Sequence, residues 1–414
     1  MDFNDTPKEA AFRAEARAWL EANGELRDPD ESATSVLSER YGDNYIEEAK
    51  AWQKKKADAR WACITWPEEY GGRGGNAMQS VIWGQEEARI KTPAPIFSIG
   101  LGMAGPTVLA HGTQEQKAQW IPKLVSGEEI WCQLFSEPAA GSDLAGLRTT
   151  AVRDGDDWVV NGQKIWTTFA HIADWGVLVL RTDPNVPKHA GLSYFVIDMH
   201  APGIEVRPIV QINRATGFNE VFFNDLRVPD ANRLDAVGNG WAVAITTLMN
   251  ERASIGGGGG QSNLFANLME LTHELEIDGR PAIEDSAVRQ QIADFYVRRK
   301  GVEYTGLRSL TALSRGGMPG PEASMAKLVG AKLLQDMGSF GMDIQAQAGA
   351  VGVEAAVQQG SWQEALLGAP GLRIAGGTDE ILRNIIAERV LRLPPETRLD
   401  KDVAFRDVPS GPAS

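Results

Sequence analysis

The feature that most constrains the fold of this chain is a block of short β-rich runs, from about residue 131 to residue 236, between two helical regions. β-branched and aromatic residues fill the runs, and turn residues separate them. The runs are Trp158-Val159-Val160, Gly176-Val177-Leu178-Val179-Leu180, Leu192-Ser193-Tyr194-Phe195-Val196-Ile197 and Val221-Phe222-Phe223. Such a block predicts a small β-barrel or sandwich, and its helical flanks predict an α+β chain.

Helical periodicity fills both flanks. Near the start of the sequence, Thr6-Pro7-Lys8-Glu9 predicts a capping box with proline in the first turn, before a helix that ends at Asn23-Gly24. Further helices are expected over residues 49–61, 113–124, 241–253, 286–313, 322–338 and 378–391, with a polar surface insertion over 25–43. We therefore expect an N-terminal α-helical domain (1–130), a middle β domain (131–236), a C-terminal α-helical domain (237–398) and a loosely ordered tail (399–414).

Composition narrows the class of protein. The net charge of −14 over 414 residues argues against nucleic acid as a partner, because phosphate binding relies on a basic face. The sequence has no apolar run near 18 residues and no charged-then-apolar leader, so we expect neither a membrane span nor a signal peptide. Cys63 and Cys132 are isolated thiols, which favours the reduced cytoplasm. The five histidines are dispersed, so we expect no protein-bound catalytic metal.

The most informative motif covers residues 134–143. It reads Leu134-Phe135-Ser136-Glu137-Pro138-Ala139-Ala140-Gly141-Ser142-Asp143. Pro138 and Gly141 predict a loop whose serines offer short polar groups to the backbone or to a ligand. Further along, Asn161-Gly162 predicts a hairpin turn that leads into a strand-like run over residues 164–168. Together these two segments resemble the flavin-contacting segments of the acyl-CoA dehydrogenase family, and the resemblance continues almost end to end.

The resemblance implies FAD as the cofactor and a C-terminal domain built as a four-helix bundle. In the family, the positions of Ser136 and Thr168 hydrogen-bond the isoalloxazine, and Trp166 covers the ring face remote from substrate. Ser142 also lies beside the CoA portion of the substrate. The candidate cofactor residues are Gln133, Leu134, Phe135, Ser136, Gly141, Ser142, Trp166, Thr167, Thr168, Arg280, Gln291, Thr378 and Glu380. The structural alternative makes Trp166 a core aromatic residue and the serines turn formers.

Two further segments extend the resemblance. Gly376-Gly377 and the candidate N-cap Thr378 precede a predicted helix, and in the family this loop touches flavin and thioester. Arg280 and Gln291 match positions through which a neighbouring subunit grips the FAD diphosphate. The family's Gln-x-x-Gly-Gly-x-Gly segment is degraded over residues 347–352, which puts its cofactor contacts and a conventional subunit arrangement in doubt.

The catalytic base is expected on a helix. Most family members carry a glutamate at the position of Gly376, and glycine cannot take a proton. Members of the isovaleryl and long-chain type instead place it directly before an arginine, which matches Glu251-Arg252. An apolar pocket raises the pKa of a carboxylate toward the working range of a general base. The candidate substrate residues are Ser142, Arg252, Gly376 and Gly377; the alternative for Glu251-Arg252 is a solvated helix face.

Five consecutive glycines, Gly256 to Gly260, follow this pair. In a helix interior they would cost about 5 kcal/mol relative to alanine. They indicate either a plain helix break or a widened acyl pocket for branched or ring-bearing chains, such as steroid side chains.

The resemblance implies α,β-dehydrogenation of an acyl-CoA thioester. Glu251 would take the α-proton, and the electrons would pass to an electron-transfer flavoprotein. The implied assembly is a homotetramer or heterotetramer. Two alternatives remain open: a non-catalytic or half-catalytic subunit of a heteromeric enzyme, and a flavin oxidase or monooxygenase on the same fold.

Overall fold

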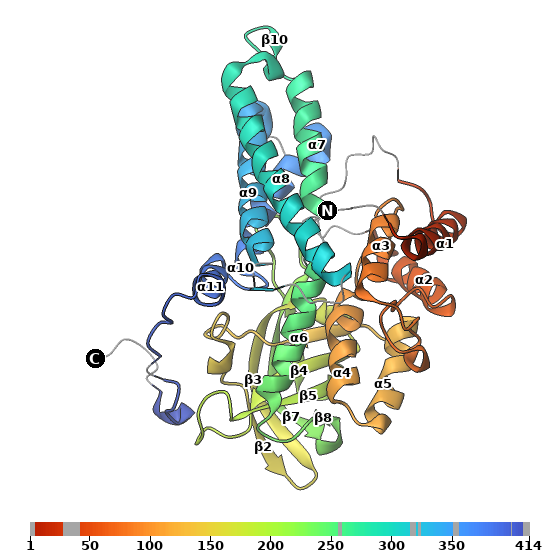
Figure 1. Ribbon diagram of the computed structural model, residues 1–414. Coiled ribbons are helices and arrows are strands. Elements are labelled where there is room, and N and C mark those ends of the chain that lie inside the picture. Colours follow the sequence, from red (N-terminus) through yellow and green to blue (C-terminus); the bar gives the residue numbers. More distant parts are fainter. Residues whose placement is uncertain are drawn as a thin grey trace. The chain divides into compact units, whose positions relative to one another are not determined.

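The structure, a computed structural model, describes residues 5–27, 42–255, 259–314, 320–321, 324–350, 356–398 and 400–408 (Figure 1). Its contacts divide the chain into two units, which are described separately. The first, here the helical unit, comprises Met1–Arg40, Asn76–Thr92 and Ile255–Pro395. The second, here the sheet unit, comprises Tyr41–Gly75, Pro93–Ser254 and Glu396–Ser414.

The helical unit consists mainly of helices with one short hairpin. Its elements are α1 (Pro7–Asn23), α3 (Ala77–Glu87), α7 (Gly259–Glu274), β9 (Glu276–Ile277), β10 (Arg280–Pro281), α8 (Ser286–Ser314), α9 (Ser324–Ile344), α10 (Ser361–Ile374) and α11 (Asp379–Ile385). The core formed by α7 to α10 includes Leu268, Phe295, Leu333 and Trp362. Of these helices the sequence predicted α1, α8, α9 and α11; it missed α3, α7 and α10.

The first helix begins as predicted. The Thr6 hydroxyl accepts from Glu9 N, and Thr6 N donates to the Glu9 carboxylate at 2.7 Å, with Pro7 in the first turn. The missed helix α3 carries the same signal, because Asn76 and Gln79 form a reciprocal capping box. Two capping boxes of different residue types therefore set the starts of both helices.

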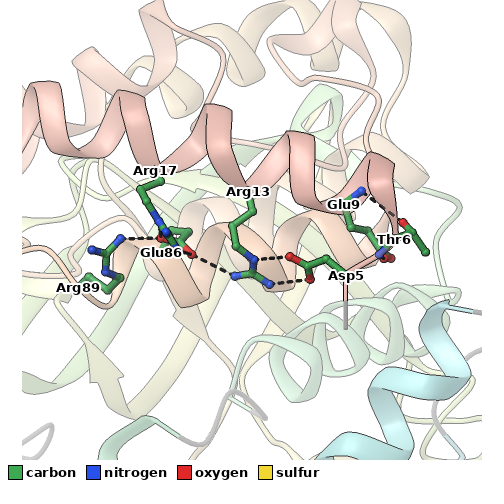
Figure 2. Close-up of polar contacts among 7 residues, drawn as sticks. All are labelled: Asp5, Thr6, Glu9, Arg13, Arg17, Glu86 and Arg89. Atoms are coloured by element: carbon green, nitrogen blue, oxygen red, sulfur yellow. Dashed lines mark hydrogen bonds and ion pairs between the residues drawn. The ribbon is translucent and has the colours of Figure 1, made fainter. Parts of the chain in front are cut away.

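A buried carboxylate on α3 joins that helix to α1 (Figure 2). Glu86 is only 3% exposed and accepts from Arg13 at 3.1 Å, Arg17 at 2.8 Å and Arg89 at 2.9 Å. Arg13 also pairs with Asp5 at 2.6 Å. The hydrogen bond from Arg17, aided by those from the other two arginines, lowers the pKa of Glu86 to about 2. The carboxylate is therefore fully charged at neutral pH.

The sheet unit contains eight of the described strands in one sheet, in the order β6-β7-β3-β2-β4-β5-β8, with β1 paired to β4. Its strands are β1 (Trp131–Leu134), β2 (Thr150–Asp154), β3 (Asp157–Thr168), β4 (Trp175–Arg181), β5 (Leu192–Asp198), β6 (Ile204–Pro208), β7 (Phe218–Pro229) and β8 (Arg233–Leu234). Its helices are α2 (Tyr45–Asp58), α4 (Gly105–His111), α5 (Gln114–Ser126) and α6 (Gly240–Ile255). All four predicted β-rich runs lie on strands, so the β character of this region is confirmed.

Apolar clusters pack against the sheet. In one of them, Val243 and Ala244 of α6 join Tyr194 and Val177 of the strands, and Figure 1 shows α6 lying across the sheet. The second cluster includes Phe195, Phe223 and Leu178. The alternation of buried side chains between the two clusters is that of strands with both faces covered.

The predicted hairpin turn at Asn161-Gly162 is wrong. Both residues lie inside β3, at a bulge in its pairing with β7, and the turn between β2 and β3 falls at Gly155-Asp156. Gly162 has φ +146°, and an added Cβ would lie 2.6 Å from the Thr149 hydroxyl. The side-chain amide of Asn161 donates to Asp225 on the neighbouring strand β7 at 2.9 Å. The glycine serves a close backbone approach and not a turn.

Part of the predicted loose tail is packed. Residues 400–408 contact the sheet unit, with an isolated bridge between Pro187 and Ala404. The predicted insertion over 25–43 lies mostly outside the described residues, as do residues 409–414. Both cysteines, Cys63 and Cys132, are buried as free thiols. None of the described helices has the length and apolar composition needed to cross a bilayer.

Candidate functional site

A buried ion pair joins the two predicted motif segments. Glu137, in the loop, and Lys164, on β3, are 8% and 0% exposed, and their charged groups are 2.8 Å apart. Lys164 also donates to the carbonyl of Phe135 at 2.9 Å. The Glu137 carboxylate accepts backbone N–H groups from Arg148 at 2.6 Å and Thr149 at 3.0 Å. Sequence reasoning gave neither charge a role, although charged residues inside a core are rare unless they are paired.

The pair is charged at neutral pH. Burial alone would raise the pKa of Glu137, but the Lys164 ammonium and the donors from Arg148 and Thr149 outweigh it and lower that pKa. Burial lowers the pKa of Lys164 to about 8, although the Glu137 carboxylate acts to raise that pKa. Lys164 is therefore a buried cation with one carboxylate partner, and the loop depends on that partner remaining ionised.

Trp166 projects from a second irregularity in β3. The register between β3 and β7 shifts between Lys164 and Thr167, and Trp166 takes φ +61°. Its side chain is 56% exposed and contacts Phe218 edge to face at 6.1 Å. A bulky residue with positive φ is an outlier, and strained backbone positions cluster at functional sites. The alternative of Trp166 as a core aromatic residue is wrong, because the ring is exposed.

The loop and β3 meet beside this tryptophan. Ile165 N donates to the carbonyl of Ser136 at 2.9 Å. The hydroxyls of Ser136 and Thr168 make no hydrogen bond within the described part of the chain, and both residues are half-buried. The Thr167 hydroxyl also has no hydrogen-bond partner in the described chain but is buried, and Asn219 donates to the Thr167 carbonyl at 2.9 Å.

The remaining candidate residues in and beside the motif loop differ in solvent exposure. Leu134 and Phe135 have buried side chains, and Gln133 is half-buried on β1. Gly141 and Ser142 are exposed, and a Cβ added to Gly141 would meet no heavy atom within 4 Å. The tip of the loop is therefore accessible, while its base is fixed in the core.

Helix α6 brings Glu251 toward the same region of the sheet unit. Thr247, fully buried on α6, is 2.9 Å from the Tyr194 hydroxyl, and the Tyr194 ring meets Phe135 edge to face at 5.9 Å. Glu251 is half-buried and lies one helical turn after Thr247, on the same side of α6. The side chain of Arg252 lies outside the described part, as do residues 256–258, so the structure decides neither alternative for the glycine run.

In the helical unit, the predicted glycine loop is held by three contacts. Gly376 and Gly377 have φ +62° and +95°, and Lys327 donates to the Gly377 carbonyl at 2.6 Å. Thr378 is the N-cap of α11 as predicted, accepting from Ile381 N at 3.2 Å. The adjacent, buried Asp379 pairs with Arg373 at 2.6 Å.

The other predicted residues of this unit are more exposed. Glu380 is exposed at the start of α11, and Arg280 is exposed on the β9–β10 hairpin. Gln291 is half-buried on α8. In the degraded segment, residues 347–350 lie in a short 3-10 turn, and 351–352 fall outside the described residues.

Comparison with known families gives the same assignment along most of the chain. Models of acyl-CoA dehydrogenases match in three consecutive parts: the N-terminal domain over residues 6–128, the middle domain over 132–226 and the C-terminal domain over 238–391. The chain belongs to the acyl-CoA dehydrogenase family. Its mixed architecture of helical, β and helical regions is the fold of that family.

Individual relatives support the same family assignment. Acyl-CoA dehydrogenase IpdE1 of Mycobacterium tuberculosis is 37% identical, over 94% of this chain and 98% of the relative. Acyl-CoA dehydrogenase FadE34 of the same species is 41% identical, over 82% of this chain and 45% of the relative. The solved ChsE4-ChsE5 complex from Mycobacterium tuberculosis superposes with a TM-score of 0.79 at 30% identity, covering 96% of this chain and 100% of that chain. The solved "Tcur3481-Tcur3483 steroid ACAD" has a TM-score of 0.81 at 28% identity and the same coverage.

As an acyl-CoA dehydrogenase, the chain is an FAD-dependent oxidoreductase that acts on acyl-CoA. The described residues fit that cofactor. An exposed indole stands beside two half-buried hydroxyls, of Ser136 and Thr168, that have no hydrogen-bond partner in the described chain. A flat ring with polar edges needs such a surface and such donors.

Proposed function

We propose that this acyl-CoA dehydrogenase forms a 2-enoyl-CoA from an acyl-CoA thioester with Glu251 as the general base. The observation that carries the proposal is the position of Glu251, one turn after Thr247 on the α6 face that packs through Tyr194 against Phe135. Phe135 directly precedes Ser136, so the motif loop and the α6 face belong to one continuous set of contacts. Gly376 offers no alternative base, because glycine has no side chain to protonate.

Different residues of the chain take different roles in the proposed reaction. The Glu251 carboxylate accepts the α-proton, which is acidified when donors stabilise negative charge on the thioester oxygen. Ser136 and Thr168 would hold the flavin edge, and Trp166 would cover one ring face. The FAD held by these residues would supply the acceptor for the hydride of the β-carbon.

Substrate and partners form the finer part of the proposal. We assign a branched or ring-bearing acyl group and an electron-transfer flavoprotein as electron acceptor. The run Gly256 to Gly260, which begins five residues after the proposed base, removes side chains there, and a structural relative is called a steroid acyl-CoA dehydrogenase. The assembly proposed is a tetramer of one or two kinds of chain.

A second candidate function rests on a specific observation. Two solved relatives are named as pairs of different chains, ChsE4-ChsE5 and Tcur3481-Tcur3483. The degraded segment over residues 347–352 favours the same arrangement, in which this chain completes a cofactor site together with a partner. Expression of the chain alone, followed by a flavin absorbance spectrum, separates the two cases. Protein that binds no FAD without a partner favours the heteromer.

The test of the proposed base is anaerobic titration of FAD-loaded protein with acyl-CoA thioesters, followed by flavin bleaching. Octanoyl-CoA and a steroid-side-chain CoA compare linear with ring-bearing substrates. We expect Glu251→Gln to lose bleaching by several orders of magnitude. The control is Glu48→Gln, which changes an exposed helix glutamate of the sheet unit and should bleach normally. A fully active Glu251→Gln protein would exclude Glu251 as the base, and a clear preference for octanoyl-CoA would exclude the ring-bearing substrate.

A further inference from the structure

The chain beyond the family match returns to the sheet unit. The C-terminal family model ends at residue 391, and residues 400–408 dock on the loop between β4 and β5. Phe405 N donates to the Val186 carbonyl at 2.9 Å, and Arg406 N donates to the Pro184 carbonyl at 3.0 Å. Two backbone hydrogen bonds and the bridge at Ala404 fix the register of this segment.

Phe405 covers a buried cation. Arg181, at the end of β4, is 1% exposed, and the centroid of the Phe405 ring lies 3.3 Å from its guanidinium carbon. Arg181 donates to the carbonyls of Ala145 at 2.6 Å and Leu147 at 3.3 Å. Within the described residues no carboxylate pairs with Arg181. Its charge is therefore stabilised by peptide carbonyls and one aromatic face, an arrangement that gains strength when water is excluded.

A second contact reaches the motif loop itself. Lys188, 11% exposed, donates to the Asp143 carboxylate at 2.9 Å and to Asp400 at 2.5 Å. Asp143 is the last residue of the motif loop and directly follows Ser142. One lysine therefore bridges the C-terminal segment to the loop, while Arg181 ties Phe405 to the turn that follows it.

Together these contacts reach an exposed loop tip that lies between buried residues, Ala140 before it and Leu144 after it. Gly141, Ser142 and Asp143 are exposed, and no heavy atom would meet a side chain at Gly141. The base of the loop is fixed by the Glu137–Lys164 pair, and the Glu137 carboxylate also accepts from the N–H groups of Arg148 and Thr149, which follow the loop. The end of the loop at residues 143–147 is fixed by Lys188 and Arg181.

We propose that residues 400–408 form a C-terminal strap in which Phe405 and Asp400 act as positioning residues for the Ser142 loop and thereby for acyl-CoA binding. The substrate part rests on the proposed function and on the family resemblance, which implies that Ser142 lies beside the CoA portion. Because the proposed base lies on α6 and is not part of the strap, loosening the strap should change substrate affinity and leave the proton transfer intact. The expected signature is a rise in KM at a nearly constant kcat.

The test uses the full-length, FAD-loaded protein and two measurements. Amide hydrogen exchange at Gly146 and Leu147, whose N–H groups bond to Asp143 and Leu144, reports the loop without any substrate. Steady-state kinetics with an acyl-CoA give KM and kcat. For Phe405→Ala we expect about tenfold faster exchange and about tenfold higher KM, the loss expected for one desolvated cation–π contact, with kcat within about twofold.

Matched variants separate the effect of the aromatic face from that of apolar bulk. Phe405→Leu keeps apolar bulk but removes the aromatic face, so its effect should lie between those of wild type and Phe405→Ala. Asp400→Asn removes one partner of Lys188 and should act in the same direction, whereas Asp402→Asn changes an exposed carboxylate two residues away and should change nothing.

Unchanged exchange at residues 146–147 in Phe405→Ala and Asp400→Asn overturns the strap. A fall in kcat at constant KM overturns its role in substrate binding. If no acyl-CoA bleaches the wild-type flavin, the proposed function and the substrate role fail together, while the exchange result still tests the strap.

Discussion

Glu137 in the sheet unit and Glu86 in the helical unit are both buried carboxylates, but they are neutralised in different ways. Glu137 faces one lysine that has no exposure of its own. Glu86 faces three arginines whose side chains are 23% to 47% exposed. A cation that reaches water can be rehydrated when its partner is lost, and a fully buried cation cannot.

The difference separates two uses of buried charge. The Glu86 network joins α1 to α3 with redundant partners, so the loss of one arginine leaves two. The Glu137–Lys164 pair has no redundancy, and it fixes the loop and strand that carry Ser136 and Trp166. In this molecule, the less tolerant charge pair lies beneath the proposed cofactor surface.

The largest effect is expected from Glu137→Gln. The substitution leaves Lys164 buried without a carboxylate, which should cost about 3–5 kcal/mol in the free energy of unfolding. The bound flavin should be lost as the motif loop detaches. Urea unfolding and flavin absorbance measure both effects. The double variant Glu137→Gln/Lys164→Met removes both charges and should be more stable than the single variant; a double variant that is less stable would contradict this account of the pair.

Two glycine substitutions test how closely each carboxylate site is packed. Gly162→Ala places a Cβ against Thr149, whose N–H bonds to Glu137, and should cost about 2–3 kcal/mol. Gly84→Ala, on α3 near Glu86, meets no heavy atom within 4 Å and should stabilise by about 0.5–1 kcal/mol through helix propensity. Thermal unfolding of both variants measures whether each substitution lowers or raises the stability. Equal destabilisation by both would remove the contrast between the sites.

Acid should weaken the helical unit through Glu86. Its pKa is about 2 in the folded protein, mainly because of Arg17, against an ordinary value of 4.5. Between these values the unfolded chain binds more protons than the folded one, so the contribution is full above pH 4.5 and lost as the pH falls toward 2. After allowance for screening at the partly exposed arginines, it amounts to about 2 kcal/mol. Between pH 6 and pH 3 wild type should lose somewhat more than half of that amount, about 1 kcal/mol, beyond the loss seen in Glu86→Gln; parallel curves would contradict it.

The smallest effect is expected from Arg89→Ala. Arg89 is 43% exposed and is one of three cations on Glu86, so its removal should cost less than about 1 kcal/mol. Chemical denaturation at neutral pH provides the measurement. A loss as large as that of Glu137→Gln would show that redundancy does not protect this site.

Local signals predicted the fold where a few neighbouring residues decide it. The capping box at Thr6 fixed the predicted start of α1, and hydrophobic runs located four strands. Helix α10 carries Pro370 and two glycines, Gly368 and Gly371, which hid its periodicity, and α7 begins within the glycine run. The sequence analysis misread Gly162 as a turn residue. A glycine is required there because Thr149 lies close to it, and this contact forms only when β2 pairs with β3.

The candidate site was predictable only in part for the same reason. Resemblance located the motif segments of the sheet unit, and the structure joins them through Ile165 and Ser136. The Glu137–Lys164 pair could not be derived, because its partners are far apart in sequence and their burial depends on the finished core. Phe405 and Arg181 are separated still further, so a tail rich in polar residues gave no sign of its docking.

The burial of both cysteines has a practical consequence. Burial raises the pKa of the Cys63 thiol to about 12 and also raises the pKa of Cys132. Maleimides and iodoacetamides react with the thiolate, which is scarcely populated at neutral pH when the pKa is this high. The folded wild-type chain should therefore remain unlabelled, and one cysteine introduced on its surface would carry a fluorophore or spin label without prior removal of the native thiols.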